Sequence, residues 1–145
     1  MFDIYILDSY KDFSDRCGGH AKKAVKEQGY SVGKVYSTTD LAELVQQCNF
    51  QKDNDLFFID VEFSSPKMSG IQIAQRIRNL SPPCSIVPVV HHAEPEYLCE
   101  LIETRIQPFG YVLRGDLKNE YVRIQECIAA MEDKETFLVK EVYYD

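Results

Sequence analysis

Leu56-Phe57-Phe58-Ile59-Asp60-Val61 is the stretch of sequence that decides the fold. Four consecutive apolar residues without polar alternation are typical of a short strand buried on both faces, as strands of parallel sheets are. The run stops at the carboxylate Asp60, and the segment 64–70, which contains serine, proline and glycine, is typical of a loop. The sequence therefore places Asp60 at the carboxyl end of a buried strand.

On either side of this strand, short apolar runs alternate with amphipathic stretches. Further strands are predicted at 4–7, 32–36, 86–90 and 111–113, and helices at 13–28, 40–48, 71–80, 94–106 and 117–131. Five strand–helix units in order predict an α/β domain with an open parallel sheet and helices on both faces. Pro88 falls inside the strand 86–90, where proline removes a ladder hydrogen bond, so we expect a bulge or a late start there.

The size and charge of the chain narrow the class of protein. Its 145 residues suffice for one domain with a real core, and no stretch approaches the roughly 20 apolar residues of a membrane-spanning helix. With no signal peptide, a cytoplasmic protein without a membrane partner is expected. A net charge of −7 argues against direct binding of DNA by these residues. Five cysteines without CxxC spacing suggest unpaired thiols in a reducing compartment.

Ligands of open parallel sheets bind at the carboxyl ends of the strands. The residues at these ends are Asp8, Ser9, Asp60, Val90, His91 and Arg114. Asp8 and Asp60 can face one another across a crevice and attract Mg²⁺, which typically takes one or two carboxylates and keeps several waters. A strand-end aspartate beside Mg²⁺ can attack a phosphoryl group, and a basic residue such as Arg114 can neutralise phosphate charge.

Four segments together, 56–61, 70–78, 85–90 and 109–114, resemble the receiver domain of two-component response regulators across residues 1–120. The similarity is greatest to LytTR-type regulators of Gram-positive quorum sensing. The resemblance implies a flavodoxin-like (βα)5 fold with strand order 2-1-3-4-5. It also implies a receiver domain over 1–130, with 131–145 as a linker or the start of a DNA-binding LytTR output domain not present in this chain.

The resemblance also assigns roles to individual residues of a signalling protein that is not an enzyme. Asp60 would accept a phosphoryl group from the phosphohistidine of a sensor histidine kinase, and Arg114 would contact the phosphate. Mg²⁺ would be held by Asp8, Asp60 and the backbone carbonyl of Glu62. The switch positions would be Val90, His91 and Tyr111. The fourth helix, fifth strand and fifth helix would form a homodimer face.

Three positions depart from the family pattern. Ser9 is neutral where a second acidic residue is expected, Val90 has no hydroxyl to bond the phosphoryl group, and Arg114 replaces a lysine. His91 or His92 could fill the space left at Val90. Loss of one carboxylate should weaken Mg²⁺ binding, and loss of the hydroxyl removes a charge-assisted hydrogen bond of about 1.5–3 kcal/mol. We therefore expect slow or absent phosphorylation by small-molecule donors.

Other readings of the same residues remain open. One is a stand-alone pseudo-receiver that acts only as a protein-interaction or dimerisation module. Another is a phosphohydrolase that uses Asp8 and Asp60 with Mg²⁺, although no general base is evident. A metal site at His91-His92 lacks further ligands at helical spacing. The segment Cys17-Gly18-Gly19-His20 has neither a preceding strand nor the arginine that a phosphatase-type cysteine loop requires.

Overall fold

The computed structural model describes residues 1–48, 54–62, 68–91, 94–103 and 110–131. Within these ranges, strands and helices alternate along the chain. They are β1 (Phe2–Leu7), α1 (Lys11–Glu27), β2 (Val32–Thr38), α2 (Leu41–Gln47), β3 (Asp55–Asp60), α3 (Gly70–Leu80), β4 (Ser85–Val90), α4 (Pro95–Glu103), β5 (Val112–Leu113) and α5 (Glu120–Ala129). The strands are parallel in the order β2-β1-β3-β4-β5, which confirms the predicted flavodoxin-like fold.

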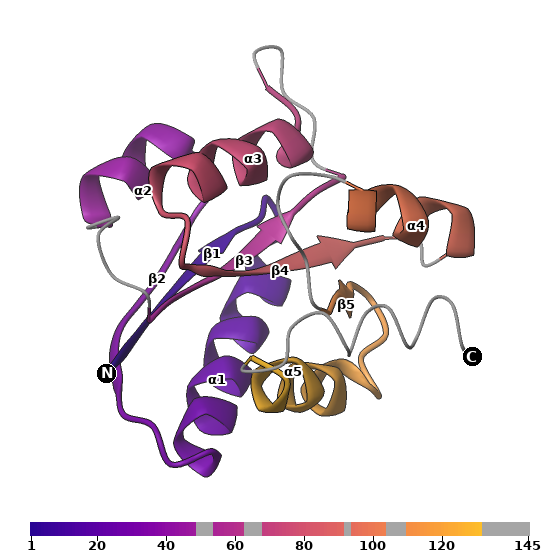
Figure 1. Cartoon of the computed structure of the whole chain (residues 1–145). Coiled ribbons are helices and arrows are strands. Elements are labelled where there is room, and N and C mark those ends of the chain that lie inside the picture. Colours follow the sequence, from indigo (N-terminus) through magenta and orange to yellow (C-terminus); the bar gives the residue numbers. More distant parts are fainter. Residues whose placement is uncertain (49–53, 63–67, 92–93, 104–109, 132–145) are drawn as a thin grey trace.

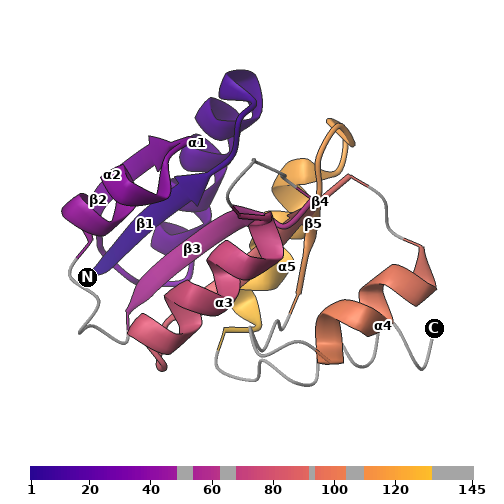
Figure 2. The same ribbon diagram turned by 90° about the horizontal axis from the view of Figure 1, so that it is seen from above.

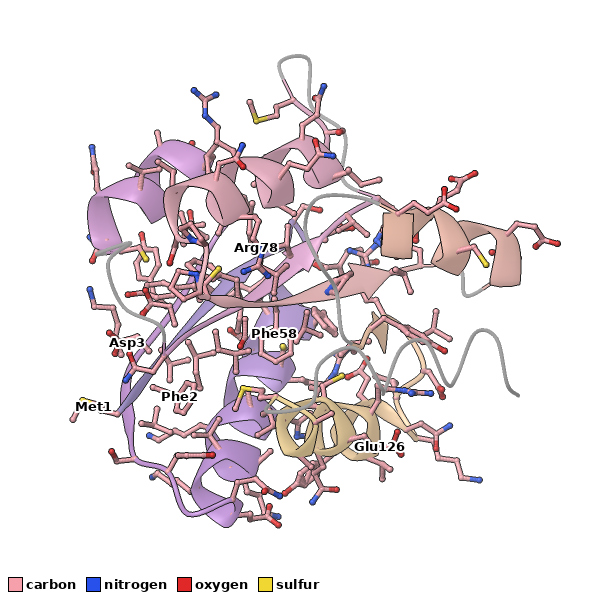
Figure 3. All side chains as sticks on the ribbon, in the orientation of Figure 1. Met1, Phe2, Asp3, Phe58, Arg78 and Glu126 are labelled. Atoms are coloured by element: carbon pink, nitrogen blue, oxygen red, sulfur yellow. The ribbon has the colours of Figure 1, made fainter. Side chains whose placement is uncertain are left out.

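Helices cover both faces of the sheet (Figures 1 and 2). Helices α1 and α5 lie together against one face, and α2 and α3 lie against the other. Each face has its own apolar core: Leu56 and Phe58 of β3 pack with the α1 and α5 side, whereas Phe57 and Ile59 pack with the α2 and α3 side (Figure 3). This alternation explains why the strand is apolar throughout, because both of its faces are buried.

The register of the sheet brings four strand ends to one edge. Leu7 of β1 pairs with Ile59 of β3, Asp60 pairs with Val89 of β4, and Val90 pairs with Leu113 of β5. The next residues along β1, β4 and β5 are Asp8, His91 and Arg114. These side chains, which are distant in sequence, therefore meet beside Asp60.

Pro88 is accommodated in a way the sequence did not predict. Strand β4 runs through it in unbroken register with β3, so the expected bulge or late start is wrong. The carbonyl of Val89 accepts from Val61 on the β3 side, and that of Val90 accepts from Arg114 on the β5 side. Since these directions alternate, the nitrogen of Pro88 faces the β5 side, and β5 first pairs with β4 one residue later.

The last helix also starts later than the sequence suggested. It begins at Glu120 and not at residue 117, because a turn occupies the preceding residues. The amide of Asn119 donates to the carbonyl of Asp116 over 3.0 Å, and its side chain bonds the Asp116 carboxylate. Of the predicted connection over 131–145, only Met131 is described, and it is buried against α1 and α5. No helix in the described ranges is long and apolar enough to cross a membrane.

Candidate functional site

Asp60 ends the central strand, and a backbone amide binds its carboxylate. It is 2% exposed, and its Oδ1 accepts a hydrogen bond from the amide of Glu62 over 3.0 Å. The following helix, α3, begins at Gly70 behind a complete capping box, in which the Ser69 and Gln72 side chains bond each other's amides. The loop after Asp60 thus starts at a fixed carboxylate and returns to a firmly capped helix.

Asp8 lies beside Asp60 and is as deeply buried, with 3% exposure. Its Oδ1 accepts from the amide of Tyr10 over 2.8 Å and from Nη1 of Arg114 over 2.9 Å. Its Oδ2 has no hydrogen-bond partner among the described residues. Burial raises the pKa of Asp8 and the charge of Asp60 raises it further, while the Tyr10 amide and the Arg114 guanidinium lower it.

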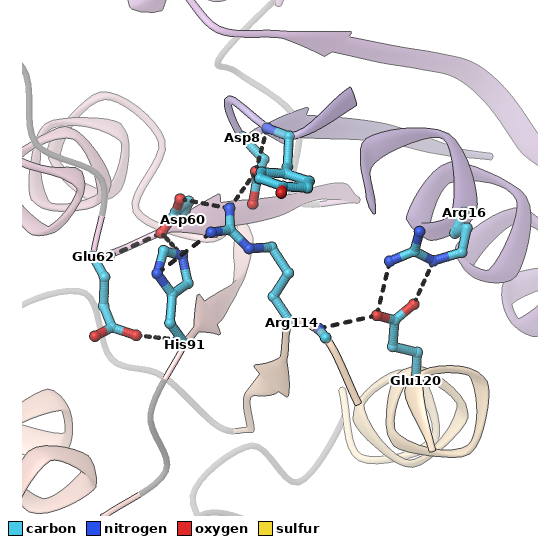
Figure 4. Close-up of polar contacts among 9 residues, drawn as sticks. Asp8, Arg16, Asp60, Glu62, His91, Arg114 and Glu120 are labelled. Atoms are coloured by element: carbon cyan, nitrogen blue, oxygen red, sulfur yellow. Dashed lines mark hydrogen bonds and ion pairs between the residues drawn. The ribbon is translucent and has the colours of Figure 1, made fainter. Parts of the chain in front are cut away.

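Arg114 reaches across the site and bridges the two carboxylates (Figure 4). Its Nη1 lies 2.9 Å from Oδ1 of Asp8 and 3.4 Å from Oδ2 of Asp60. The Arg114 amide donates to the carbonyl of Val90 over 2.8 Å, and the guanidinium lies over the ring of Tyr10 at 4.7 Å. We call this arrangement of Arg114 between Asp8 and Asp60 the Arg114 bridge.

His91 is the other side chain that approaches Asp60. Its Nε2 lies 3.1 Å from Oδ1 of Asp60, and its Nδ1 lies 3.5 Å from Nη2 of Arg114. The His91 amide donates to the carboxylate of Glu62. An imidazole nitrogen therefore lies against Asp60 at the end of β4, where Val90 offers no hydroxyl; His92 lies outside the described residues.

The other two residues predicted as switch positions are buried in the core. Val90 is fully buried, and Tyr111 is 7% exposed; both pack in the core on the α2 and α3 side. The carbonyl of Tyr111 accepts from Sγ of Cys127 over 3.6 Å, and the Arg123 guanidinium lies over its ring at 4.7 Å. Neither side chain belongs to the charged group around Asp60.

The sequence reasoning missed a second ion pair that positions Arg114. Glu120, at the start of α5, is 2% exposed and accepts from Nε and Nη2 of Arg16 over 2.9 and 3.1 Å (Figure 4). It also accepts from the amide of Gly115 over 3.3 Å. Gly115 has a φ of +97°, which favours glycine, so the chain can turn directly after Arg114. The one available signal was a glycine two residues after the predicted strand 111–113.

Ser9, the neutral residue after Asp8, is exposed. It lines a hollow of about 360 Å³ between the ends of β1 and β2, together with hydroxyl-bearing and charged side chains. Asp8 and Ser14 form part of the same lining. No carboxylate at position 9 is present to complete an acidic pair with Asp8.

Comparison with known proteins identifies the family. The profile of the response regulator receiver domain matches residues 19–112, most of the chain. This chain belongs to the response regulator receiver family. Receiver domains are signalling modules of two-component systems, and they generally bind Mg²⁺ at their acidic site. None of the curated protein sequences matches the chain.

Solved receiver structures share the fold at low sequence identity. The isolated receiver domain of RcsB from Salmonella enterica serovar Typhimurium, with the phosphomimetic BeF₃⁻, is 19% identical with a TM-score of 0.66, covering 91% of this chain and 88% of that one. The receiver domain of AraT from Geobacillus stearothermophilus is 20% identical with a TM-score of 0.64, covering 92% and 94%. A longer RcsB structure from Salmonella typhimurium is 17% identical with a TM-score of 0.71, and the match covers 99% of this chain and 66% of that one.

The arrangement in this receiver does not fit a Mg²⁺ ion. Mg²⁺ demands close to octahedral oxygen coordination. Both oxygens of Asp60 face protein groups, Oδ1 the Glu62 amide and His91, and Oδ2 the Arg114 guanidinium. Of the four carboxylate oxygens of Asp8 and Asp60, only Oδ2 of Asp8 has no described partner, and the described residues contain no cluster of three ligating side chains that the Glu62 carbonyl could complete. The space between the carboxylates holds a guanidinium.

Proposed function

We propose that this receiver takes its signal at Asp60, the position at which a sensor histidine kinase would deliver a phosphoryl group. The observation that carries the proposal is the buried Asp60 carboxylate at the end of the central strand, with Asp8 and Arg114 beside it. From the resemblance to LytTR-type response regulators, we also propose that the protein acts in the cytoplasm and regulates transcription.

The chemistry at Asp60 would be a simple group transfer. One carboxylate oxygen attacks phosphorus, the P–N bond to the kinase histidine breaks, and the electron pair leaves with the imidazole nitrogen, which then takes a proton. Arg114 lies against Oδ2 of Asp60, so its guanidinium is placed to meet the charge of the incoming phosphoryl oxygens. Val90 offers no hydroxyl to them, which supports slow transfer.

A labelling experiment with acetyl phosphate tests this proposal. The intact mass and the ³¹P NMR spectrum of the full chain are followed over time, with Asp60→Asn as the matched control. Slow, partial modification that is absent from Asp60→Asn is the expected result. Rapid and stoichiometric modification would contradict slow transfer, and modification that persists in Asp60→Asn would show that another residue is the acceptor.

We further propose that the output lies in a LytTR-like DNA-binding domain and that α4, β5 and α5 form a homodimer face. Much of the apolar surface predicted for that face is core, since Leu101, Ile124 and Ile128 are buried. Exposed apolar side chains do lie beside β5 and on α5: Leu117 is 65% exposed and Val122 is 51% exposed. Sedimentation of the chain and of Val122→Glu over a range of concentrations tests the dimer, which the variant is expected to weaken.

A second candidate function is a protein-interaction module that needs no phosphoryl group. The Arg114 bridge favours it, because the charges around Asp60 are already paired within the chain. Phosphoryl-independent association predicts that Asp60→Asn leaves the sedimentation profile unchanged in the presence and absence of acetyl phosphate. A profile that responds to acetyl phosphate only when Asp60 is present supports the phosphoacceptor function instead.

A further inference from the structure

We propose that the guanidinium of Arg114 takes the place of the divalent cation between Asp8 and Asp60, so that this receiver neutralises its acidic site without metal. The inference concerns the same site as the proposed function and rests on it for the identity of Asp60. It goes further, because it replaces the expected metal requirement with a side chain of the protein itself.

The two buried carboxylates favour a cation between them. Asp8 and Asp60 are buried carboxylates, with 3% and 2% exposure, at the ends of adjacent strands. Two neighbouring buried carboxylates oppose each other's ionisation unless a positive charge lies between them. Nη1 of Arg114 lies within 3.4 Å of an oxygen of each, and a guanidinium stays charged at every physiological pH.

The guanidinium is held in place from several sides. The centroid of the Tyr10 ring lies 4.7 Å from Cζ of the guanidinium, and Nδ1 of His91 lies 3.5 Å from Nη2. The backbone of Arg114 is fixed by two hydrogen bonds. The Arg114 amide donates to the carbonyl of Val90, and the amide of the next residue, Gly115, donates to the carboxylate of Glu120. A metal ion entering between the carboxylates would have to displace a cation that is already oriented.

The remaining donors could not easily hold a metal beside the guanidinium. Oδ2 of Asp8 is the one carboxylate oxygen of the pair without a described partner, and Ser9 supplies no second charge. A cation there would face the positive Arg114 across a single carboxylate. A metal ion and the guanidinium should therefore compete for the same two carboxylates.

Direct measurement of metal binding tests the inference. Mn²⁺ serves as the probe because carboxylate oxygens bind it and its free concentration is read from the electron paramagnetic resonance signal. The full chain is titrated beside Arg114→Ala, Arg114→Ala/Asp60→Asn and Arg76→Ala, which removes an exposed arginine of α3. Arg114→Gln, which keeps much of the side-chain length, replaces Arg114→Ala if thermal unfolding shows that the alanine variant does not fold.

The expected result is a gain of affinity confined to the emptied site. Arg114→Ala should bind Mn²⁺ about tenfold or more tightly than the unaltered chain, because a charged competitor has gone. Arg76→Ala should match the unaltered chain, and adding Asp60→Asn should abolish the gain. Equal binding by the unaltered chain and Arg114→Ala, or a gain that survives Asp60→Asn, would overturn the inference.

The titration uses no phosphoryl donor, so it can fail independently of the proposed function. Labelling of Asp60 with acetyl phosphate in the presence of a chelator provides the second measurement. Labelling that proceeds at an undiminished rate without metal supports the inference, and labelling that strictly requires Mg²⁺ overturns it while leaving Asp60 as the acceptor. The same experiment on Asp60→Asn decides the acceptor itself.

Discussion

Gly70 lies directly against the peptide that links Asp60 to Val61. A β-carbon at position 70 would overlap the carbonyl oxygen of Asp60 and lie 2.7 Å from Cα of Val61. The first residue of α3 therefore packs against the backbone at the end of β3, from which the carboxylate of Asp60 projects.

A Gly70→Ala substitution should be costly for this reason. The added methyl group meets backbone, which yields less readily than a flexible side chain, so we expect the free energy of unfolding to fall by about 1–3 kcal/mol. Chemical denaturation measures the change. The control is Gly19→Ala in α1, where a β-carbon meets nothing within 4 Å. That variant should gain up to about 1 kcal/mol from helix propensity, and equal effects at the two positions would contradict the steric argument.

Asp8 should make stability depend on acidity. Burial raises its pKa above the ordinary 3.8, so the folded chain retains a proton at pH values where the unfolded chain has released it. The stabilisation due to Asp8 is therefore complete below that value and is lost as the pH rises through the raised pKa. The stability of the unaltered chain relative to Asp8→Asn should fall over this window. Urea unfolding at a series of pH values measures the difference in free energy of unfolding. Asp12→Asn, which removes an exposed carboxylate, is the control. If the curves of stability against pH for the unaltered chain and Asp8→Asn run parallel, the prediction is refuted.

The ion pair of Glu120 with Arg16 should matter more than a surface pair. Glu120 is buried and accepts from both Arg16 and the Gly115 amide, so Glu120→Gln should lower the free energy of unfolding by about 1–3 kcal/mol. Glu126→Gln breaks the more exposed pair with Arg123, at 3.4 Å, and should change stability by less than about 0.5 kcal/mol. If the two variants lose equal stability, burial of Glu120 does not govern the strength of its contacts.

Cys99 should be the thiol that reacts first in the folded protein. It is partly exposed, whereas Cys17, Cys48, Cys84 and Cys127 are buried. Burial raises the pKa of Cys17 well above the ordinary value and that of Cys48 to about 12, which leaves little thiolate near neutral pH. A colorimetric disulfide reagent should therefore label one thiol per chain rapidly, and Cys99→Ser should remove that phase. A fast phase that survives in Cys99→Ser would show that a buried thiol becomes accessible in the native state.

The architecture could be predicted because its signals are local. An apolar run such as Leu56–Ile59 is typical of a parallel sheet that helices cover on both faces, and the positions of the strand ends then follow. Asp8, Asp60 and Arg114 could be placed at one edge for the same reason. The prediction at Pro88 was wrong because its outcome depends on which side of β4 is paired at that residue. The predicted start of α5 was wrong because a turn bonded between Asp116 and Asn119 precedes the helix.

The contacts that define the site depend on distances between remote segments, which sequence periodicity does not contain. The approach of His91 to Asp60, the stacking of Tyr10 against Arg114 and the ion pair of Arg16 with Glu120 each join residues that are far apart in the sequence. Gly70 carried no signal beyond its place before a helix. Its importance appears only when the carbonyl of Asp60 is seen to lie against it.

The shortness of β5 has a consequence for the protection of backbone amides against hydrogen exchange. β3 is paired along both sides, whereas β5 is paired with β4 over only two residues in the described part of the sheet. Local opening costs least where few backbone bonds break, so β5 amides should exchange long before those of β3. The two carboxylates of the site are thus anchored to β1 and β3, in the part of the sheet that opens last. Their guanidinium counter-ion belongs to the residue after β5, so local opening of β5 should separate the site without global unfolding.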